Sequence, residues 1–397
     1  MRLFKALLAF TAMVPSLTSA LEIDNQNIGS VKAAARTVAN NLMTYYNPSY
    51  PMGGLQPPYY WWEAGGLMGS MIEYWHYTGD ATYNDAIARG LLSQAGPGRD
   101  FMGPHTDGND DQGWFALAAM AAAEYGFPQP AGSPPWIDLA KNVFNQFASR
   151  WDTTRCNGGM KWKIQPGADG YHYKSSISNG VAFQLAARLA KFTKEGRYLD
   201  WASMSFDWMR SVNLIDNDYN VFDGTDDAKT TGCPDVNHDQ WSYNVGVFLY
   251  GSAVLQAHTN DPKWIDRTNG LIRASSVFFE NNVMIEKQCE RAGNCNVDQQ
   301  SFKAYLARWL AATAVLVPST QSAIVPLIAT SANGAMMACT GPQNSQCGFK
   351  WTTRNFDGLT GVGQHMAALE IMHGLTVNPA MNRMSLAPKG HARRFTA

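Results

Sequence analysis

The sequence predicts an all-α fold, an (α/α)6 barrel (toroid) in which six inner helices are each paired with one of six outer helices. Two observations favour this fold. Three stretches of the chain share one helix–turn–helix layout, and the first helix of each stretch is largely apolar. A third observation argues against a sheet: no segment alternates apolar and polar residues for long enough to predict a buried strand.

The shared layout is a helical run, a turn that begins with threonine, and an aromatic residue five positions later that opens the next helix. The three turns are Thr78–Tyr83, Thr193–Tyr198 and Thr259–Trp264. Repetition of one helical hairpin is typical of repeat folds. The predicted inner helices are residues 62–77, 112–125, 178–192, 243–258, 299–317 and 364–375; outer helices include 30–46, 136–149 and 321–333.

The composition of the predicted inner helices favours a closed barrel over an open solenoid. Residues 111–124, for example, are apolar nearly all round, as in a buried helix. An open helical solenoid is the alternative, but it would need polar capping repeats at its ends, and none is visible. We therefore expect one barrel domain over residues 21–376, followed by a flexible C-terminal tail over residues 377–397.

Residues 1–20 are typical of a signal peptide. Arg2 and Lys5 give a basic start, residues 3–14 are mostly apolar, and residues 16–20 are mostly small. This pattern predicts secretion, to the cell wall or the outer face of the plasma membrane.

Six cysteines fit an oxidising compartment. Proximity predicts disulfides Cys289–Cys295 and Cys339–Cys347, which leaves Cys156 with Cys233, although six cysteines allow 15 pairings. A metal site is the alternative reading, but the chain has no Cys-x-x-Cys and its eight histidines are scattered. We predict no metal and no cofactor.

The amino-acid composition limits the classes of ligand that the protein is expected to bind. The net charge is −1, which gives no basic surface for nucleic acid or an anionic membrane. Charged residues make up 16% and aromatic residues 12%, including 13 tryptophans, a balance that suits a neutral sugar, although packing alone would also use many aromatic residues. We expect a monomer.

The amino ends of the six inner helices should share one rim, because these helices run in the same direction. The residues at these starts are polar, amide-rich or aromatic, as a sugar site requires. Trp61, Trp62 and Tyr243 are predicted stacking surfaces, with packing as the alternative, and Asn179 and Asn244 are predicted hydroxyl ligands or helix caps. The predicted substrate-binding residues are Trp61, Trp62, Glu63, Asn109, Gln112, Asn179, Asp223, Tyr243 and Asn244; Asp223 comes from an acidic loop that does not match an EF-hand.

The candidate catalytic residues are Asp110 and Asp111. Glycoside cleavage generally needs two carboxyl groups, and neighbouring carboxylates tend to raise one pKa, which lets the two divide the roles of acid and base. Ordinary helix capping is the alternative, since Asn109 is a good N-cap residue and Gln112 completes a capping-box-like pattern. The polar starts of the other inner helices favour catalysis.

Seven motifs carry a family resemblance. They are Tyr60–Gly66, Tyr74–Asp80, Gly108–Gln112, Ser176–Gly180, Gln240–Gly246, Cys289–Gln299 and Phe302–Leu310. Over residues 22–375 the chain resembles glycoside hydrolase family 76, the α-1,6-mannanases, and in particular its fungal branch of cell-wall proteins that act on GPI-anchored partners.

The resemblance implies a retaining mechanism with Asp110 as nucleophile and Asp111 as general acid/base, their carboxyl groups about 5–5.5 Å apart. It also implies an α-1,6-mannosyl oligosaccharide or GPI-core glycan as donor and a β-glucan as acceptor; hydrolysis and transfer both stay open. A catalytically inactive glycan-binding wall protein is the alternative function. Members of this branch usually end in a hydrophobic tail for their own GPI anchor; Ser385–Ala397 shows none, so anchoring stays open.

Two cations inside a predicted inner helix need partners. Lys303 and Arg308 lie in an otherwise apolar run, where an unpaired charge is costly. We predict structural ion pairs for both, with substrate contacts as the alternative.

Overall fold

The computed structural model describes residues 21, 23–24, 27–228, 232–343 and 345–376. The predicted signal peptide and C-terminal tail lie outside these residues. The described helices are α1 (Ile28–Met43), α2 (Trp61–Thr78), α3 (Asn84–Ser93), α4 (Asn109–Tyr125), α5 (Trp136–Ser149), α6 (Ser176–Thr193), α7 (Gly196–Ser211), α8 (Ser242–Thr259), α9 (Pro262–Ala274), α10 (Phe302–Leu316), α11 (Gln321–Ala338) and α12 (Val362–Thr376).

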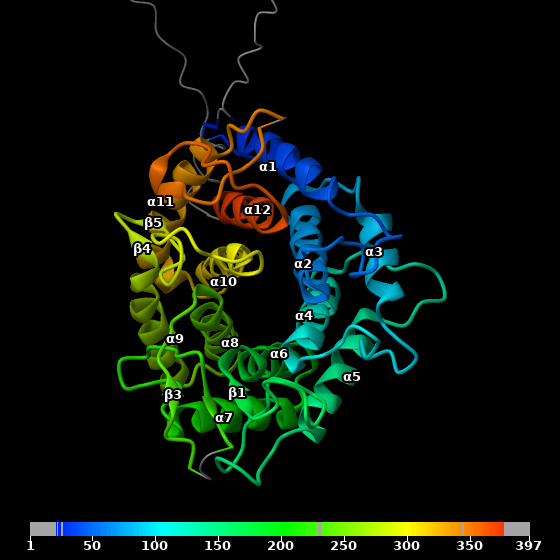
Figure 1. Cartoon of the computed structure of the whole chain (residues 1–397), viewed down its shortest axis with the longest axis vertical. Helices are drawn as coiled ribbons and strands as arrows, with labels where there is room; N and C mark the ends of the chain where they lie inside the picture. Colours follow the sequence, from blue (N-terminus) through cyan, green and yellow to red (C-terminus); the bar gives the residue numbers. More distant parts are fainter. Residues whose placement is uncertain (1–20, 22, 25–26, 229–231, 344, 377–397) are drawn as a thin grey trace, which may run out of the picture.

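The even-numbered helices form a closed inner ring (Figure 1). Each packs on the next in chain order, and α12 packs on α2, which closes the ring. The ring closes because these helices are buried on nearly every side, so each needs two inner neighbours and an outer partner. The predicted (α/α)6 barrel is confirmed, and the open solenoid is excluded.

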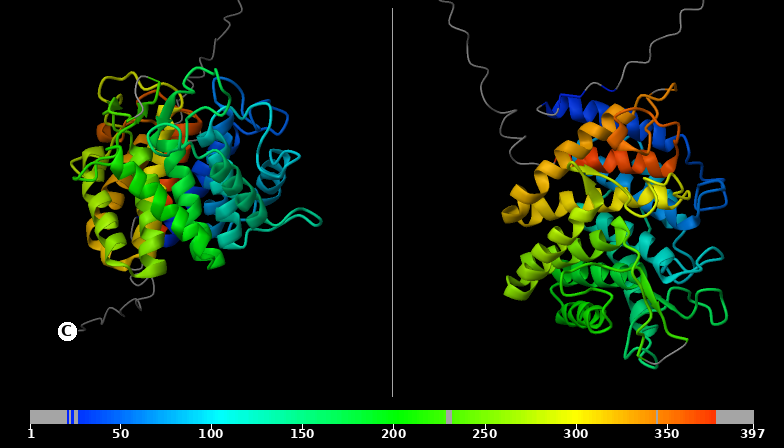
Figure 2. Two further views of the ribbon diagram at one scale, coloured as in Figure 1. Left: turned by 90° about the horizontal axis from the view of Figure 1, so that it is seen from below. Right: turned by 60° about the vertical axis from the view of Figure 1, so that its left-hand side comes forward.

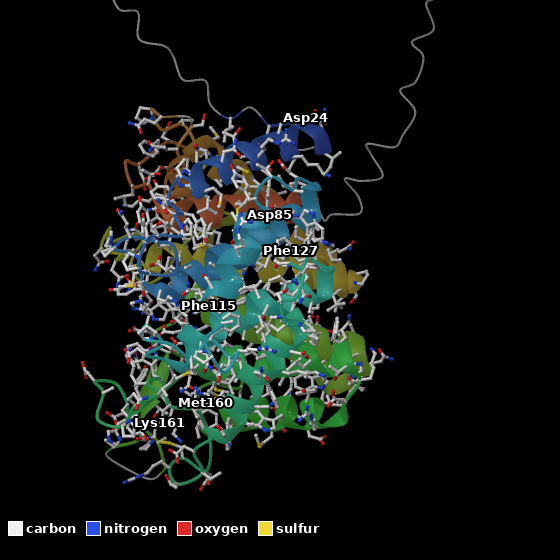
Figure 3. All side chains as sticks on the ribbon, turned by 90° about the vertical axis from the view of Figure 1, so that its right-hand side faces the viewer. Asp24, Asp85, Phe115, Phe127, Met160 and Lys161 are labelled. Atoms are coloured by element: carbon white, nitrogen blue, oxygen red, sulfur yellow. A yellow bond between two sulfur atoms is a disulfide. The ribbon has the colours of Figure 1, made fainter. Side chains whose placement is uncertain are left out.

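The odd-numbered helices form the outer layer (Figure 2). α3, α5, α7, α9 and α11 each pack on the inner helix before them, and α1 packs on α12. In Figure 3, Phe115 lies in the first half of α4 and Phe127 just beyond its last residue, so α4 runs from the loop-covered end of the barrel to the opposite end. The other inner helices run the same way, so α12 ends, and the outer helix α1 begins, at the end of the barrel without the long loops.

Long loops cover the amino ends of the inner helices. They contain an antiparallel sheet of β1 (Tyr173–Ser175), β2 (Gly224–Asp226) and β3 (Val236–Asn237), and a hairpin of β4 (Phe279–Glu280) and β5 (Val283–Met284). Short 3-10 turns occur at Ser275–Phe278, Gln299–Ser301, Pro318–Thr320 and Trp351–Thr353. The turn at Gln299–Ser301 explains why α10 begins three residues after the predicted start.

Three disulfides hold these loops. Cys156–Cys233, Cys289–Cys295 and Cys339–Cys347 are all formed, so the predicted pairing is confirmed. No single described helix is long and apolar enough to cross a bilayer, although residues 299–316 and 318–338 meet that test as a pair bent by 119°.

The two predicted buried cations have carboxylate partners, and the prediction of structural ion pairs is confirmed. Lys303 Nζ lies 2.9 Å from a Glu290 oxygen, and Arg308 Nη2 lies 2.6 Å from Glu370 Oε1. Glu73, Glu370 and His373 are arranged closely enough to hold a cation, but the Arg308 guanidinium already supplies the positive charge there.

Candidate active site

The amino end of α4 carries the predicted carboxylate pair. Gly108 is the extended N-cap residue, and Asp110 and Asp111 lie in the first turn. The Asp111 carboxylate accepts a hydrogen bond from the Gly108 N–H at 2.7 Å, where a helix has N–H groups without an internal partner. Asp111 therefore caps the helix. Asn109 and Gln112, which the capping alternative named, are not the cap, because Gly108 is the N-cap residue and α4 begins at Asn109, three residues before the predicted inner helix.

Asp110 is held by two donors from other elements. The Trp162 Nε1–H donates to Asp110 Oδ2 at 3.1 Å, and the Ser178 hydroxyl at the start of α6 donates to Asp110 Oδ1, also at 3.1 Å. Ser178 in turn accepts from the Ser175 hydroxyl at 2.9 Å. This chain of donors fixes the carboxylate, which is only 9% exposed.

Gly108 lets the two carboxylates approach each other. A β-carbon at this position would stand 2.5 Å from Asp110 Oδ1 and 3.1 Å from Asp111 Oδ2. Those two oxygens can therefore be no farther apart than the sum of the two distances. Any residue other than glycine at position 108 would clash with the Asp110 carboxylate and force it to shift.

Burial raises the pKa of both carboxyl groups. It raises the pKa of Asp110 to about 8, with the charge of Asp111 as the next cause. Burial also raises the pKa of Asp111, against the lowering effects of the Gly108 N–H and Lys163. Two carboxyl groups coupled in this way titrate as a pair, which holds one proton near neutral pH.

A cleft of about 380 Å³ opens beside Asp111. α2 contributes two tryptophans, the loop between α5 and β1 contributes an indole and an ammonium group, and the segment before α10 contributes a carboxylate. These residues are Trp61, Trp62, Trp162, Lys163 and Asp298. Aromatic faces beside a few charged groups are the usual lining of a sugar site.

Comparison with known proteins identifies the family. The profile of glycosyl hydrolase family 76 matches residues 30–386. The chain belongs to glycosyl hydrolase family 76. It is 43% identical over 367 residues to the mannan endo-1,6-alpha-mannosidase DCW1 of Eremothecium gossypii, covering 89% of this chain and 81% of that protein.

Solved structures agree with this family 76 assignment. Dfg5 from Chaetomium thermophilum, in complex with glucosamine, is 38% identical with a TM-score of 0.85, over 90% of this chain and 92% of that one. An inactive variant of the α-1,6-mannanase GH76A of Salegentibacter, in complex with α-1,6-mannotriose, shares the fold at 17% identity and a TM-score of 0.71, over 88% and 99% of the two chains. The family predicted from the motifs is confirmed.

In this family 76 chain, the predicted aromatic residues serve both packing and the cleft. Trp61 is 5% exposed and stacks on Phe115 at 4.2 Å, so it reaches the cleft by an edge. Trp62 is half-buried, 5.2 Å from the Trp114 ring, and lines the same cleft. Tyr243 is half-buried and lies flat against Phe302 at 3.9 Å.

Several predicted ligands are bonded within the protein instead. Asn109 and Gln112 both accept from the Arg150 guanidinium, at 2.6 and 2.8 Å. The Asn179 amide bonds to main-chain groups of Met160 and Ser175. These buried side chains position the rim, and their predicted contacts with substrate stay a prediction. The N-cap residue of α6 is Ser175, and not Asn179.

Glu63 also forms a hydrogen bond within the protein. Its Oε2 accepts from the Tyr60 N–H at 2.8 Å, which caps α2. Its Oε1 is buried with no partner among the described residues, and burial raises the pKa of the carboxyl to about 8.

Asp223 and Asn244 are placed differently, near the Tyr243 hydroxyl. Asp223 accepts from the Tyr173 hydroxyl at 2.6 Å. Both polar atoms of the buried Asn244 amide lack a hydrogen-bond partner in the described part of the chain. Burial raises the pKa of Asp223, and the nearby Asn244 amide lowers it in part. Asn244 is not a cap either, since Trp241 precedes α8. After burial, Asp223, Asp110 and Asp298 all raise the pKa of Tyr243, so this phenol faces carboxylates from both sides of the rim.

The sequence reasoning missed Trp162 and Lys163. Both lie in the irregular loop between α5 and β1, where no helical periodicity marks a facing direction. The available signal was a tryptophan between two lysines in a glycine-containing stretch.

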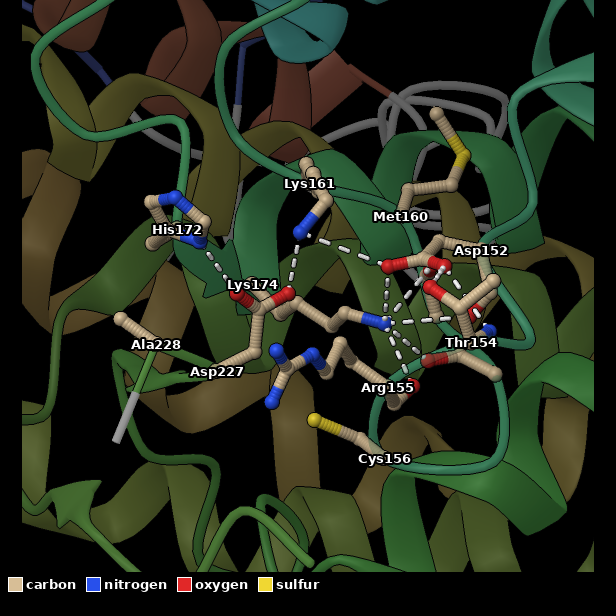
Figure 4. A network of polar contacts seen from close by, with 12 residues as sticks. Asp152, Thr154, Arg155, Cys156, Met160, Lys161, His172, Lys174, Asp227 and Ala228 are labelled. Atoms are coloured by element: carbon tan, nitrogen blue, oxygen red, sulfur yellow. Dashed lines mark hydrogen bonds and ion pairs between the residues drawn. The ribbon is translucent and has the colours of Figure 1, made fainter. Parts of the chain in front are cut away.

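The loop that carries Trp162 is fixed by buried charge (Figure 4). Lys161 pairs with Asp227 and with Asp152, and the fully buried Lys174 lies 3.2 Å from Asp152 Oδ2. Lys174 also donates to several loop carbonyls, including that of Arg155 at 2.9 Å. Together with main-chain hydrogen bonds of Trp162 with Tyr173 in β1 and with Asn109 in α4, these contacts keep the Trp162 indole against Asp110.

Proposed function

We propose that this family 76 protein is a retaining endo-α-1,6-mannosidase and transglycosidase of the cell wall, with Asp110 as nucleophile and Asp111 as general acid/base. The observation that carries the proposal is that Asp111 lines a tryptophan-lined cleft and that the Asp110 carboxylate lies close to it, beside Gly108. The limit on the distance between Asp110 Oδ1 and Asp111 Oδ2 is compatible with the about 5–5.5 Å between the carboxyl groups of retaining enzymes.

The proposed reaction has two steps. In the first, an Asp110 oxygen attacks the anomeric carbon, the glycosidic C–O bond breaks, and Asp111 gives its proton to the leaving oxygen. In the second, Asp111 takes a proton from water or a sugar hydroxyl, whose oxygen attacks the anomeric carbon and releases Asp110. The shared proton supports this division of roles. When Asp111 holds it, the negative charge that raises the pKa of Asp110 is gone, and the donors Trp162 and Ser178 favour an ionised Asp110.

The relatives support the substrate class. The Eremothecium relative is named a mannan endo-1,6-alpha-mannosidase, and the inactive Salegentibacter variant has two consecutive aspartates replaced by asparagine and holds α-1,6-mannotriose. We extend this to the mannan core of GPI-anchor glycans as donor and wall β-glucan as acceptor, which would link GPI proteins to the wall. Three disulfides support an extracellular location.

The decisive experiment measures cleavage of α-1,6-mannotetraose by wild type, Asp110→Asn and Asp111→Asn. We expect each substitution to lower kcat at least about a hundredfold, as loss of a nucleophile or a proton donor does. Asp85→Asn, on an exposed surface of α3, is the matched control and should leave kcat unchanged. Wild-type turnover in both active-site variants would refute the assignment, and binding without turnover in wild type would favour a glycan-binding protein.

Transfer is tested separately by product analysis. Incubation of a GPI-core glycan with a β-1,3-glucan oligosaccharide should give a new linkage between the two. Only free reducing ends, at every acceptor concentration, would restrict the protein to hydrolysis.

A further inference from the structure

A second pocket lies at the opposite end of the barrel from the active-site cleft. It has a volume of about 280 Å³ and is formed where α2, α4, α6, α8 and α10 end. These ends surround the barrel axis, so the pocket is a depression at the centre of the far end. None of its residues takes part in the chemistry described above.

Five of the eleven residues that line the pocket are aromatic, and most of the others are apolar. His76 stacks on Tyr125 with ring centroids 3.9 Å apart and planes 14° apart, which leaves the outer face of the imidazole free. Phe192 is 45% exposed and Val315 is 48% exposed, although both lie at the ends of otherwise buried helices. An inner-helix end needs no such exposed apolar groups for folding, because they bury nothing.

Polar groups stand between these aromatic faces. Lys191 has no ion-pair partner, and the Tyr250 hydroxyl has no hydrogen bond, among the residues that the structure describes. Glu124 is held at the base by Arg188, whose Nη2 lies 2.6 Å from its carboxylate. The pocket therefore offers donors and an acceptor in fixed positions within apolar walls.

We propose that this pocket is a non-catalytic carbohydrate-binding site that takes one hexopyranose unit of a wall polysaccharide. The apolar face of a pyranose packs on aromatic rings, and its hydroxyls need both donors and acceptors at the ring edge. A volume of about 280 Å³ suits one such unit. The site is independent of whether the cleft hydrolyses or transfers, and it would hold the protein on polysaccharide while the cleft stays open.

The test uses the full chain with Asp110→Asn, so that no ligand is cleaved, and measures binding of β-1,3-glucohexaose and α-1,6-mannotetraose by calorimetry and saturation-transfer NMR. We expect one of these oligosaccharides to bind a second site, and Phe192→Ala and His76→Ala to weaken that site about tenfold. In the enzyme with Asp110 intact, both substitutions should leave kcat/KM on mannotetraose unchanged. Met337→Ala, which removes a similarly exposed side chain from α11, is the matched control.

Two outcomes would overturn the proposal. One is that each oligosaccharide binds at one site only and that Phe192→Ala leaves its affinity unchanged. The other is concentration-dependent self-association that Phe192→Ala abolishes, which would make this surface a contact between two copies. Folding of each variant is checked by its unfolding midpoint, and Lys191→Ala gives a second variant at the same site.

Discussion

Burial and a nearby ammonium group act in opposite directions on the pKa values of Asp110 and Asp111. Burial raises the pKa of both carboxyls, while the Lys163 ammonium lowers both. Lys163 also lies 4.2 Å from the Trp162 ring, which keeps it at the cleft wall. A half-buried cation near a buried acid pair should thus set the pH range of activity without touching the reacting atoms.

Replacing Lys163 with methionine tests this role. The variant keeps the apolar stem and removes the charge, so the pKa values of the pair should rise. We expect both limbs of the kcat/KM–pH profile to move to higher pH by roughly 0.5–1 unit, less than the 1–3 units of a close buried pair. Lys263→Met on α9 is the control, and an unmoved profile would mean that Lys163 does not act on the pair.

The raised pKa of Asp110 also predicts a cost in stability. An unfolded aspartate titrates near pH 3.9, whereas burial and the charge of Asp111 raise the pKa of folded Asp110 to about 8, so that the Asp110–Asp111 pair keeps one proton. Between these values the folded protein holds a proton that the unfolded chain has lost, so stability falls as pH rises through this window. Asp110→Asn should therefore be more stable than wild type at pH 7, by about 1–3 kcal/mol, with the difference shrinking toward pH 4. Urea unfolding at both pH values measures this, and equal stability at pH 7 would contradict it.

The inner helices pack through polar as well as apolar contacts. Arg308 on α10 reaches Glu370 on α12 and the Gly66 carbonyl and Ser70 hydroxyl on α2. Three inner helices thus meet at one guanidinium. Its removal would leave Glu370 without its main partner in a site with no exposed surface.

Arg308→Met should destabilise the protein by about 3–5 kcal/mol, because it leaves a buried carboxylate uncompensated. Arg291→Met removes an exposed arginine paired with Glu280 and should cost less than about 1 kcal/mol. Denaturant unfolding of the two variants gives the comparison. Similar small losses for both would show that the buried pair adds little to barrel stability.

Prediction from sequence succeeded where periodicity governs structure. The outer helix α5 has the predicted bounds, Trp136–Ser149, because its amphipathic face repeats every turn. Periodicity also located the rim and the aspartate pair. It carries no information on irregular loops, so Trp162 and Lys163 were missed, and it does not show which amides already have main-chain partners, as Asn179 does.

Across the whole molecule, helix packing closes the barrel, and disulfides hold its loops in place. Cys156 and Cys233 are 77 residues apart and join the two loops that flank the site, whereas Cys289 and Cys295 are 6 apart. Loop-closure entropy grows with the length of the closed segment. The first bridge should therefore stabilise the fold more than the second.

Removal of each bridge by serine pairs tests the difference. The chain-entropy estimate is about 4 kcal/mol for Cys156–Cys233 and about 2 kcal/mol for Cys289–Cys295. We also expect the first variant to lose activity, since its loop carries Trp162. Unfolding midpoints and kcat of both variants are the measurements, and a larger loss for the shorter bridge would contradict the prediction.

The common direction of the inner helices has a consequence for how the molecule is displayed. Because α12 ends and α1 begins at the end of the barrel away from the long loops, a tether joined to either helix leaves from the side opposite Asp110 and Asp111. Immobilised through Thr376 or Ile28, the protein would present its tryptophan-lined opening outward, accessible to large glycans. Reporter fusions at either position should accordingly leave catalysis intact.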